Sequence, residues 1–117
     1  MLDDNCLFCK IIKGEIPSTK VYEDEYVYAF NDINPEAPIH VLIVPKKHIT
    51  SILDIKEEDK EYIQKIMEAA QKIAKELNVD ESGFRFISNC GPDAGQTVNH
   101  LHFHLLAGKK LGERVIA

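Results

Sequence analysis

The chain has 117 residues, of which 44% are hydrophobic and 28% are charged, and its net charge at pH 7 is -5. This length and composition suit one globular domain with a buried core, and they argue against a disordered protein. The negative charge argues against nonspecific nucleic-acid binding; the lack of a long apolar run or a signal-peptide pattern argues against a membrane protein and favours a cytoplasmic one.

A short helix is predicted from Asn5 to Lys13, because Asn5 can cap its first turn and Gly14 can end it. The segments that follow are rich in β-branched and aromatic residues and are separated by loops that contain proline or glycine, which is typical of strands. The predicted strands are 20–23, 27–31, 40–45, 84–89 and 99–106.

One long amphipathic helix is predicted between the third and fourth strands. Apolar residues recur at intervals of three and four from Ile63 to Leu77, with charged residues between them. Asp54 and Glu57 resemble a capping box at its start, and Asn78 fits its end. Its apolar stripe would pack on the sheet or on a partner subunit. The elements together indicate an α+β fold with a five-stranded antiparallel sheet, one long helix and one short helix.

Three histidines at alternate positions, His100, His102 and His104, form the most distinctive pattern. In a strand their rings would share one face, while Leu101 and Phe103 would face the core. That apolar opposite face argues against a solvated surface row. Two kinds of chemistry remain: a metal site, because His-x-His is a common ligand spacing, and phosphoryl or nucleotidyl transfer through a histidine nucleophile. The polar loop before the row supplies donors for phosphoryl oxygens and so favours the second.

Cys6 and Cys9 form a Cys-x-x-Cys pair, while Cys90 stands alone. Three cysteines are too few for a disulfide framework. The spacing of the pair is that of two zinc ligands, which is half of a site. Two buried thiols on a short helix would explain the pair equally well.

Several motifs in order along the chain resemble the histidine-triad (HIT) superfamily. They are Cys6-Leu7-Phe8-Cys9-Lys10-Ile11-Ile12, Gly14-Glu15-Ile16-Pro17, Phe30-Asn31-Asp32-Ile33-Asn34-Pro35, Ala37-Pro38-Ile39-His40, Pro45-Lys46-Lys47-His48 and His100-Leu101-His102-Phe103-His104-Leu105-Leu106. The Hint branch, which consists of homodimeric nucleoside phosphoramidate hydrolases, is the most similar. The resemblance implies a single HIT domain over residues 1–117. It also implies an enzyme of the adenosine 5'-monophosphoramidase type that works through a covalent nucleotidyl-histidine.

The resemblance also implies roles for individual residues. His102 matches the nucleophile, and His100, His104 and His40 complete the catalytic set. Asp32 matches the acidic residue that binds the ribose hydroxyls, although an aspartate at this place would also stabilise a turn. The residues expected to form the walls of the base pocket are Phe8, Ile11 and Ile33. The residues expected to surround the phosphate are Asn89, Gly95, Gln96, Thr97 and His104.

Some features depart from the Hint pattern. Thr97 stands where the branch has serine, and Gly95-Gln96-Thr97-Val98 is similar to the Fhit branch, which cleaves dinucleoside polyphosphates. Asn31 stands where many members have histidine, and the tail 109–117 lacks the tryptophan and proline ending of many Hint proteins. The alternative functions are therefore a dinucleoside polyphosphate hydrolase and a purine nucleotide-binding module without catalysis.

The resemblance extends the cysteine pair as well. In the distant relative galactose-1-phosphate uridylyltransferase two histidines complete such a pair, and the matching residues here are His48 and His100. With Cys6 and Cys9 they would form a closed, structural zinc site, while the chemistry itself would require no cofactor. The expected partners are a purine nucleotide and a second copy of the chain, with no nucleic acid and no membrane.

Overall fold

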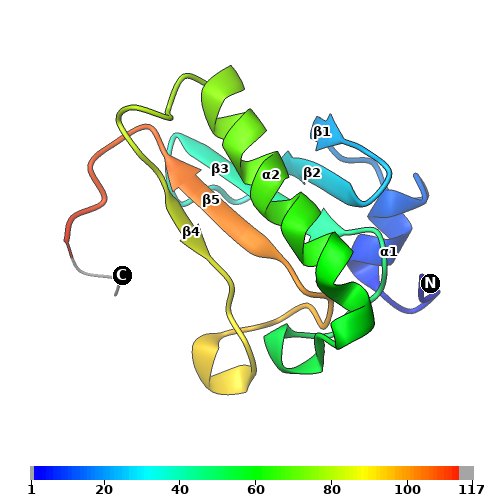
Figure 1. Ribbon diagram of the computed structural model, residues 1–117. Helices are drawn as coiled ribbons and strands as arrows, with labels where there is room; N and C mark the ends of the chain where they lie inside the picture. The colour runs from blue at the N-terminus through cyan, green and yellow to red at the C-terminus, as the bar shows by residue number, and fades with distance from the viewer. Residues whose placement is uncertain (1, 114–117) are drawn as a thin grey trace.

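The computed structural model describes residues 2–113, so Met1 and 114–117, the two ends of the predicted domain, lie outside the described residues. The helices and strands, shown in Figure 1, are α1 (Leu7–Ile12), β1 (Lys20–Glu23), β2 (Val27–Asn31), β3 (Ile39–Pro45), α2 (Lys60–Glu76), β4 (Arg85–Ile87) and β5 (Phe103–Ala107). The described residues also form three short 3-10 helices, which are Ile52–Asp54, Glu57–Asp59 and Pro92–Ala94. Within residues 2–113, no helix is long and apolar enough to cross a membrane.

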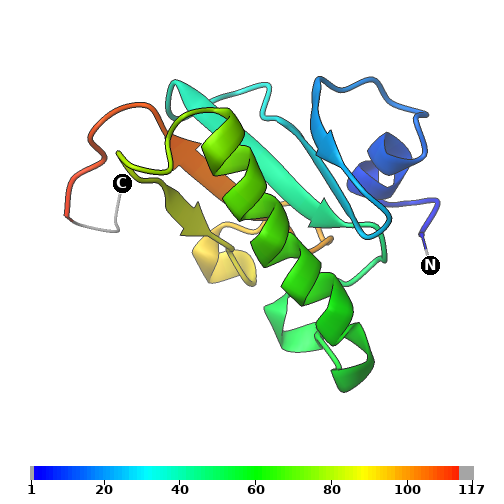
Figure 2. The ribbon, with the colours of Figure 1, turned by 45° about the horizontal axis from the view of Figure 1, so that its top comes forward.

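All five strands belong to one antiparallel sheet with the order β1-β2-β3-β5-β4. The long helix α2 crosses one face of this sheet, and the short helix α1 packs against the other face near β2 (Figures 1 and 2). The predicted α+β fold, with five antiparallel strands, one long helix and one short helix, is confirmed.

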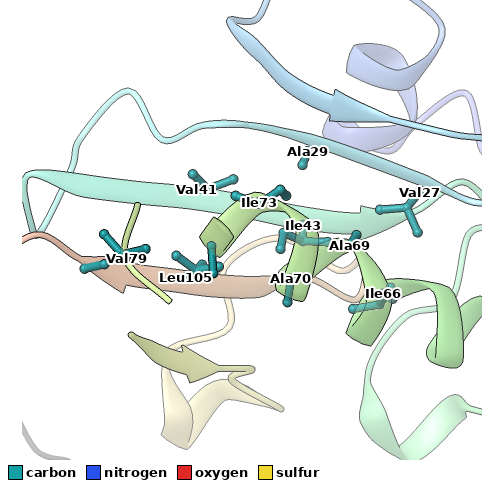
Figure 3. Close-up of a cluster of buried hydrophobic side chains, with 12 residues drawn as sticks. Val27, Ala29, Val41, Ile43, Ile66, Ala69, Ala70, Ile73, Val79 and Leu105 are labelled. Atoms are coloured by element: carbon teal, nitrogen blue, oxygen red, sulfur yellow. The ribbon is translucent and has the colours of Figure 1, made fainter. Parts of the chain in front are cut away.

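The inner side of α2 forms the larger hydrophobic core (Figure 3). Its buried residues are Ile66, Ala69, Ala70, Ile73 and Ala74. The alanines let the helix approach the sheet closely, so that the isoleucines reach the buried side chains of Val41, Ile43 and Leu105. The predicted apolar stripe of the long helix therefore packs on the sheet.

The first turn of α1 is capped by a cysteine and not by the predicted asparagine. Cys6 has an extended backbone, and its Sγ accepts a hydrogen bond from the backbone N–H of Cys9 at 3.2 Å. Asn5 lies one residue before this cap. Gly14 ends the helix as predicted, with a φ of 81° that favours glycine.

The predicted start of α2 is wrong, while its predicted end is confirmed. Asp54 belongs to a separate 3-10 turn, where the hydroxyl of Ser51 donates to its carboxylate at 2.7 Å. The carboxylate of Asp59 accepts from the N–H of Lys56 at 2.9 Å, so it caps the second 3-10 turn, and α2 follows directly. At the other end Asn78 has a φ of 60°, the left-handed conformation typical of a helix exit.

The last strand is shorter than predicted. It begins at Phe103, so only His104 of the three histidines lies in β5, while His100 and His102 precede it. The ladder ends here because β4 stops opposite His104, and because Pro45 has no N–H to offer further along β3. The strand predicted at 84–89 is likewise reduced to β4.

Candidate active site

A cleft of about 520 Å³ opens on the face of the sheet that carries α1. The predicted site residues that line it are Phe8, Ile11, Asp32, Ile33, His40, Thr97, His102 and His104. Three predicted phosphate-binding residues, Asn89, Gly95 and Gln96, do not line it. His100 lies deeper and is fully buried. The structure thus brings most of the predicted residues to one cleft, although they come from five different segments of the chain.

His102 is held from two sides just before β5. Its Nδ1 lies 2.7 Å from the backbone oxygen of His100, and its ring contacts Phe8 edge to face with centroids 5.0 Å apart. A carbonyl oxygen can only accept a hydrogen bond, so Nδ1 carries the proton and Nε2 keeps its lone pair. The ring is therefore fixed in the tautomer that leaves Nε2 free to act as a nucleophile.

His104 is oriented by a chain of hydrogen bonds from the other side of the cleft. Its Nδ1 lies 2.9 Å from Nε2 of His40, and the backbone N–H of Glu36 donates to Nδ1 of His40 at 3.0 Å. A neutral His40 therefore carries its proton on Nε2 and donates it to His104, which must then carry its own proton on Nε2. The carboxylate of Asp32, 3.4 Å from Nε2 of His40, stabilises positive charge on that ring.

Two of the three histidines that line the cleft, His102 and His104, have a lowered pKa and are uncharged at neutral pH. Burial lowers the pKa of His102 below the ordinary histidine value, against the raising effects of its hydrogen bond to His100 and of the Asp32 charge. Burial, followed by the neighbouring rings of His102 and His40, lowers the pKa of His104 to about 4. An uncharged imidazole keeps the lone pair that a nucleophile requires.

The middle of the cleft is apolar. Phe8 from α1 and Phe30 from β2 meet edge to face with centroids 5.6 Å apart. Ile33, in the loop after β2, is 90% exposed at the cleft margin. A large apolar side chain left in water beside an apolar cleft is suited to cover a planar ligand.

Gln96 is engaged within its own loop. Its Oε1 accepts from the N–H of Gly91 at 2.9 Å, and its Nε2 donates to the backbone oxygens of Thr50 at 2.8 Å and Val98 at 3.1 Å. All of its polar atoms have protein partners, so Gln96 stabilises the loop that carries Thr97. Sequence reasoning missed this arrangement because the partners are backbone groups, one of them the oxygen of the distant Thr50.

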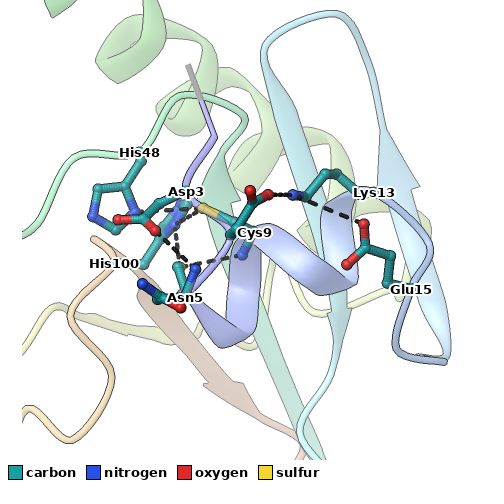
Figure 4. A network of polar contacts seen from close by, with 9 residues as sticks. Asp3, Asn5, Cys9, Lys13, Glu15, His48 and His100 are labelled. Carbon is teal, nitrogen blue, oxygen red and sulfur yellow. Dashed lines mark hydrogen bonds and ion pairs between the residues drawn. The ribbon is translucent and has the colours of Figure 1, made fainter.

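The residues named for a metal lie together beside α1 (Figure 4). Their four ligand atoms are all within 4.8 Å of one another. The Sγ of Cys6 lies 3.2 Å from Nδ1 of His100. The Sγ of Cys9 lies 3.4 Å from Nδ1 of His48 and 3.4 Å from Nδ1 of His100. The cluster adjoins the cleft through Phe8, whose ring centroid is 6.1 Å from that of His100.

The tautomer of His100 suits a cation, whereas the thiol of Cys9 would have to lose its proton to bind one. Nε2 of His100 lies 2.9 Å from the backbone oxygen of Pro45, so its proton is on Nε2 and the lone pair of Nδ1 faces the sulfurs. Burial raises the pKa of the Cys9 thiol to about 11 and lowers that of His100 to about 4. Two sulfurs and two ring nitrogens are the donor set of structural zinc sites.

The backbone groups that orient the rings were not predicted. The N–H of Glu36 and the oxygens of His100 and Pro45 fix three imidazoles. Ser88 adds a further contact, since its hydroxyl donates to the backbone oxygen of His102 at 2.8 Å. Nearly every residue has the same backbone groups, so residue identity cannot show which of them contacts a histidine ring. A serine in the sequence likewise does not indicate its distant partner.

Comparison with known proteins places these features in a family. The HIT domain family model matches residues 13–111. A solved HIT family hydrolase from Clostridium thermocellum is 53% identical, with a TM-score of 0.94, over 97% of this chain and 99% of that chain.

Two further relatives have names that bear on the site. The purine nucleoside phosphoramidase of Escherichia coli (strain K12) is 42% identical over 109 residues, which are 93% of this chain and 92% of that protein. A 14 kDa zinc-binding protein of Zea mays is 46% identical over 113 residues, which are 94% of this chain and 88% of that protein.

Proposed function

The chain belongs to the HIT domain family and is a hydrolase of that family, and we propose that it hydrolyses nucleoside phosphoramidates with His102 as a covalent nucleophile. The observation that carries the proposal is the hydrogen bond from Nδ1–H of His102 to the oxygen of His100, which leaves Nε2 with a lone pair in the cleft. The name of the Escherichia coli relative supports phosphoramidates of purine nucleosides as the substrate class.

The proposed reaction has two displacements at the α-phosphorus. Nε2 of His102 forms a bond to phosphorus while the substrate P–N bond breaks, and the amine departs with a proton from the medium. Water then attacks the same phosphorus and gives up a proton, and the P–N bond to His102 breaks to release the nucleoside monophosphate. In both steps the Nε2–H of His104 can donate to the phosphoryl oxygen on which negative charge builds up.

The rest of the nucleotide would occupy the remainder of the cleft. Asp32 accepts hydrogen bonds from the ribose hydroxyls, as a carboxylate with two oxygens can. Phe8, Ile11 and Ile33 contact the base, which is planar and largely apolar on its faces. The hydroxyl of Thr97 is the side-chain donor of its loop that lies at the cleft, since Gln96 is already engaged.

A panel of substrates tests the reaction class. Adenosine 5'-monophosphoramidate and a dinucleoside polyphosphate should be offered side by side, and phosphoramidate hydrolysis should be faster by at least about tenfold. A quenched reaction should contain protein heavier by one nucleoside monophosphate, with the modification on His102. Faster cleavage of the dinucleoside polyphosphate would favour the alternative hydrolase, and nucleotide binding without turnover would favour the non-catalytic module.

We also propose that Cys6, Cys9, His48 and His100 hold a structural zinc ion. The four converging ligand atoms and the name of the Zea mays relative support this. When bound, zinc would supply a positive charge that keeps both thiols deprotonated. The cluster is closed by four protein side chains, so a metal held there would have no open position for a substrate.

A homodimer that uses α2 is the proposed assembly. The inner side of α2 packs against the sheet and is not available to a partner. Met67 on the helix, however, is 36% exposed, and Phe84, just before β4, is 39% exposed. The strand β4 is also an edge of the sheet. Exposed large apolar side chains next to a sheet edge are suited to burial against a second copy.

A further inference from the structure

A buried phenol interrupts the apolar surface beneath the cleft. Tyr28 on β2 is only 8% exposed and packs in the cluster that contains Phe30, Leu42 and Val44. Its hydroxyl lies 2.7 Å from Oγ of Ser18. Ser18 lines the cleft and Tyr28 does not, so the two hydroxyls connect the inside of the protein with the wall of the cleft.

The pair has spare hydrogen-bonding capacity. Two hydroxyls bring two O–H donors and four lone pairs, and their mutual contact uses one donor and one lone pair. Within residues 2–113 neither hydroxyl has another protein partner. One O–H and several lone pairs therefore remain, and they lie on the Ser18 side because Tyr28 is enclosed.

The sheet register places Ser18 far from the catalytic histidines, two residues before Lys20, which is the β1 residue in line with His104. His104 on β5 lies opposite Leu42 on β3, and Leu42 lies opposite Phe30 on β2. Ser18 immediately precedes the β1 region, which the N–H of Asn31 holds by donating to the backbone oxygen of residue 19 at 3.0 Å. The path from His104 to Ser18 thus crosses three strand spacings, about 14 Å. This is a suitable length for a nucleotide laid across the sheet.

The part of the cleft between these ends is apolar. Phe8, Phe30 and Leu42 line it, and such surfaces suit the faces of a base. With the phosphate at His102, the polar edge of the base would reach Ser18. A polar base edge left without a partner in an apolar pocket would lose its hydrogen bonds to water, so the hydroxyl pair would decide which base is accepted.

We infer that Ser18, held by Tyr28, hydrogen-bonds the polar 6-substituent of a bound purine, an inference that rests on the proposed nucleotide site. A rotating hydroxyl accepts from a 6-amino group and donates to a 6-oxo group, so it tolerates both common purines. It discriminates against a purine with only hydrogen at that position. Ser18 is a specificity-determining residue, and Tyr28 is its positioning residue.

Binding of monophosphates tests the inference without relying on catalysis. Calorimetry should compare adenosine 5'-monophosphate with purine riboside 5'-monophosphate, which lacks the 6-amino group. The wild-type protein should bind the adenosine compound about threefold to tenfold more tightly, the range of one neutral hydrogen bond. Ser18→Ala should reduce this ratio to near one, and Tyr28→Phe should reduce it part of the way. The control Ser82→Ala, an exposed serine in a different cleft, should keep the wild-type ratio.

The outcomes separate the inference from the proposed function. A wild-type ratio of one, or an unchanged ratio in Ser18→Ala, overturns the inference while leaving phosphoramidate hydrolysis intact. Failure to cleave any phosphoramidate, with the binding ratios as expected, overturns the proposed function and leaves the hydroxyl pair in place. If neither monophosphate binds, the inference is overturned, and the proposed function is overturned with it only if no phosphoramidate is cleaved.

Discussion

The Nδ1–H of His102 donates to the backbone oxygen of His100 at 2.7 Å, while the side chain of His100 points at the sulfurs of Cys6 and Cys9. One residue therefore provides both the acceptor that holds the proposed nucleophile and a ligand atom of the proposed metal site. Movement of His100 would change the direction of Nε2 of His102. The stability of the cluster and the direction of Nε2 of His102 are therefore linked through His100.

His102→Ala should abolish turnover and leave nucleotide binding largely intact. The variant has no Nε2 to form the bond to phosphorus, so the loss in kcat should be about 10⁴-fold or more. The apolar walls and Asp32 remain, and binding of adenosine 5'-monophosphate should persist. Substantial turnover in a clean preparation of the variant would contradict the covalent mechanism.

His40→Ala should lower kcat more than it changes KM. Without His40, the Nδ1 of His104 loses its partner at 2.9 Å, so its tautomer is no longer fixed and the donor to the phosphoryl oxygen is lost part of the time. A reduction of about 10- to 100-fold in kcat is expected, as for the loss of an orienting partner. Equal losses in binding and kcat would indicate a general disturbance of the cleft and would argue against this positioning role.

The strands show where sequence patterns suffice. Those predicted at 20–23 and 27–31 coincide with β1 and β2, because β-branched and aromatic residues end there at polar turns. The strand predicted at 99–106 does not coincide with β5. A strand extends only as far as its pairing, and the pairing of β5 ends at Ile87 of β4 and Ile43 of β3, which are distant in sequence.

The same distinction separates the site residues that could be predicted from the sequence from those that could not. The identities of His102 and His104 could indicate the cleft, whereas Asp32 alone could not, because its carboxylate also accepts from the N–H of Asn34 at 2.8 Å, the turn contact that the sequence left open. The position of Gln96 could not be predicted, since its amide bonds to the backbone of Thr50 and Val98. The Ser18 hydroxyl gave no signal either, because its meaning depends on a tyrosine brought near by the fold.

Met67→Glu should convert a dimer into a monomer. If α2 forms part of the interface, a carboxylate at this partly exposed position would have to be buried without a partner. Light scattering at micromolar concentration should show the mass fall by half. Leu53→Glu is the matched control, since Leu53 is 85% exposed on the short 3-10 helix Ile52–Asp54 and should leave the mass unchanged. A monomeric wild-type protein would refute the assembly.

Lys47→Met should destabilise the protein at neutral pH and much less in acid. The Lys47 ammonium pairs with the buried carboxylate of Asp59 and, with the Lys56 N–H, holds the pKa of that carboxyl below its usual value. The contribution of the ion pair is therefore present at pH above about 4 and is lost as pH falls through the lowered pKa. Tm at pH 7 should drop by at least about 4 °C, and the gap from wild type should shrink by pH 3.

The control for this ion pair is Lys60→Met. Lys60 pairs with Glu57 at 3.0 Å, but both side chains are exposed, and such pairs contribute little. Its Tm should differ from wild type by less than about 2 °C at each pH. A Tm gap for Lys47→Met that stays constant with pH would contradict the role of the Asp59 charge.

Cys6→Ser gives opposite outcomes for the two interpretations of the cysteine pair. The Sγ of Cys6 caps α1 by accepting from the N–H of Cys9, and serine is a better N-cap than cysteine. If capping is the only role of Cys6, the variant should be as stable as wild type or more stable. If Cys6 holds zinc, the variant should lose the metal and its Tm should fall by at least about 4 °C.

We expect the second outcome, with one zinc ion per wild-type chain by elemental analysis of protein purified without a histidine tag. Cys90→Ser, at a half-buried thiol outside the cluster, should retain both the zinc and the Tm. A metal-free wild type as stable as Cys6→Ser would reduce Cys6 and Cys9 to buried thiols.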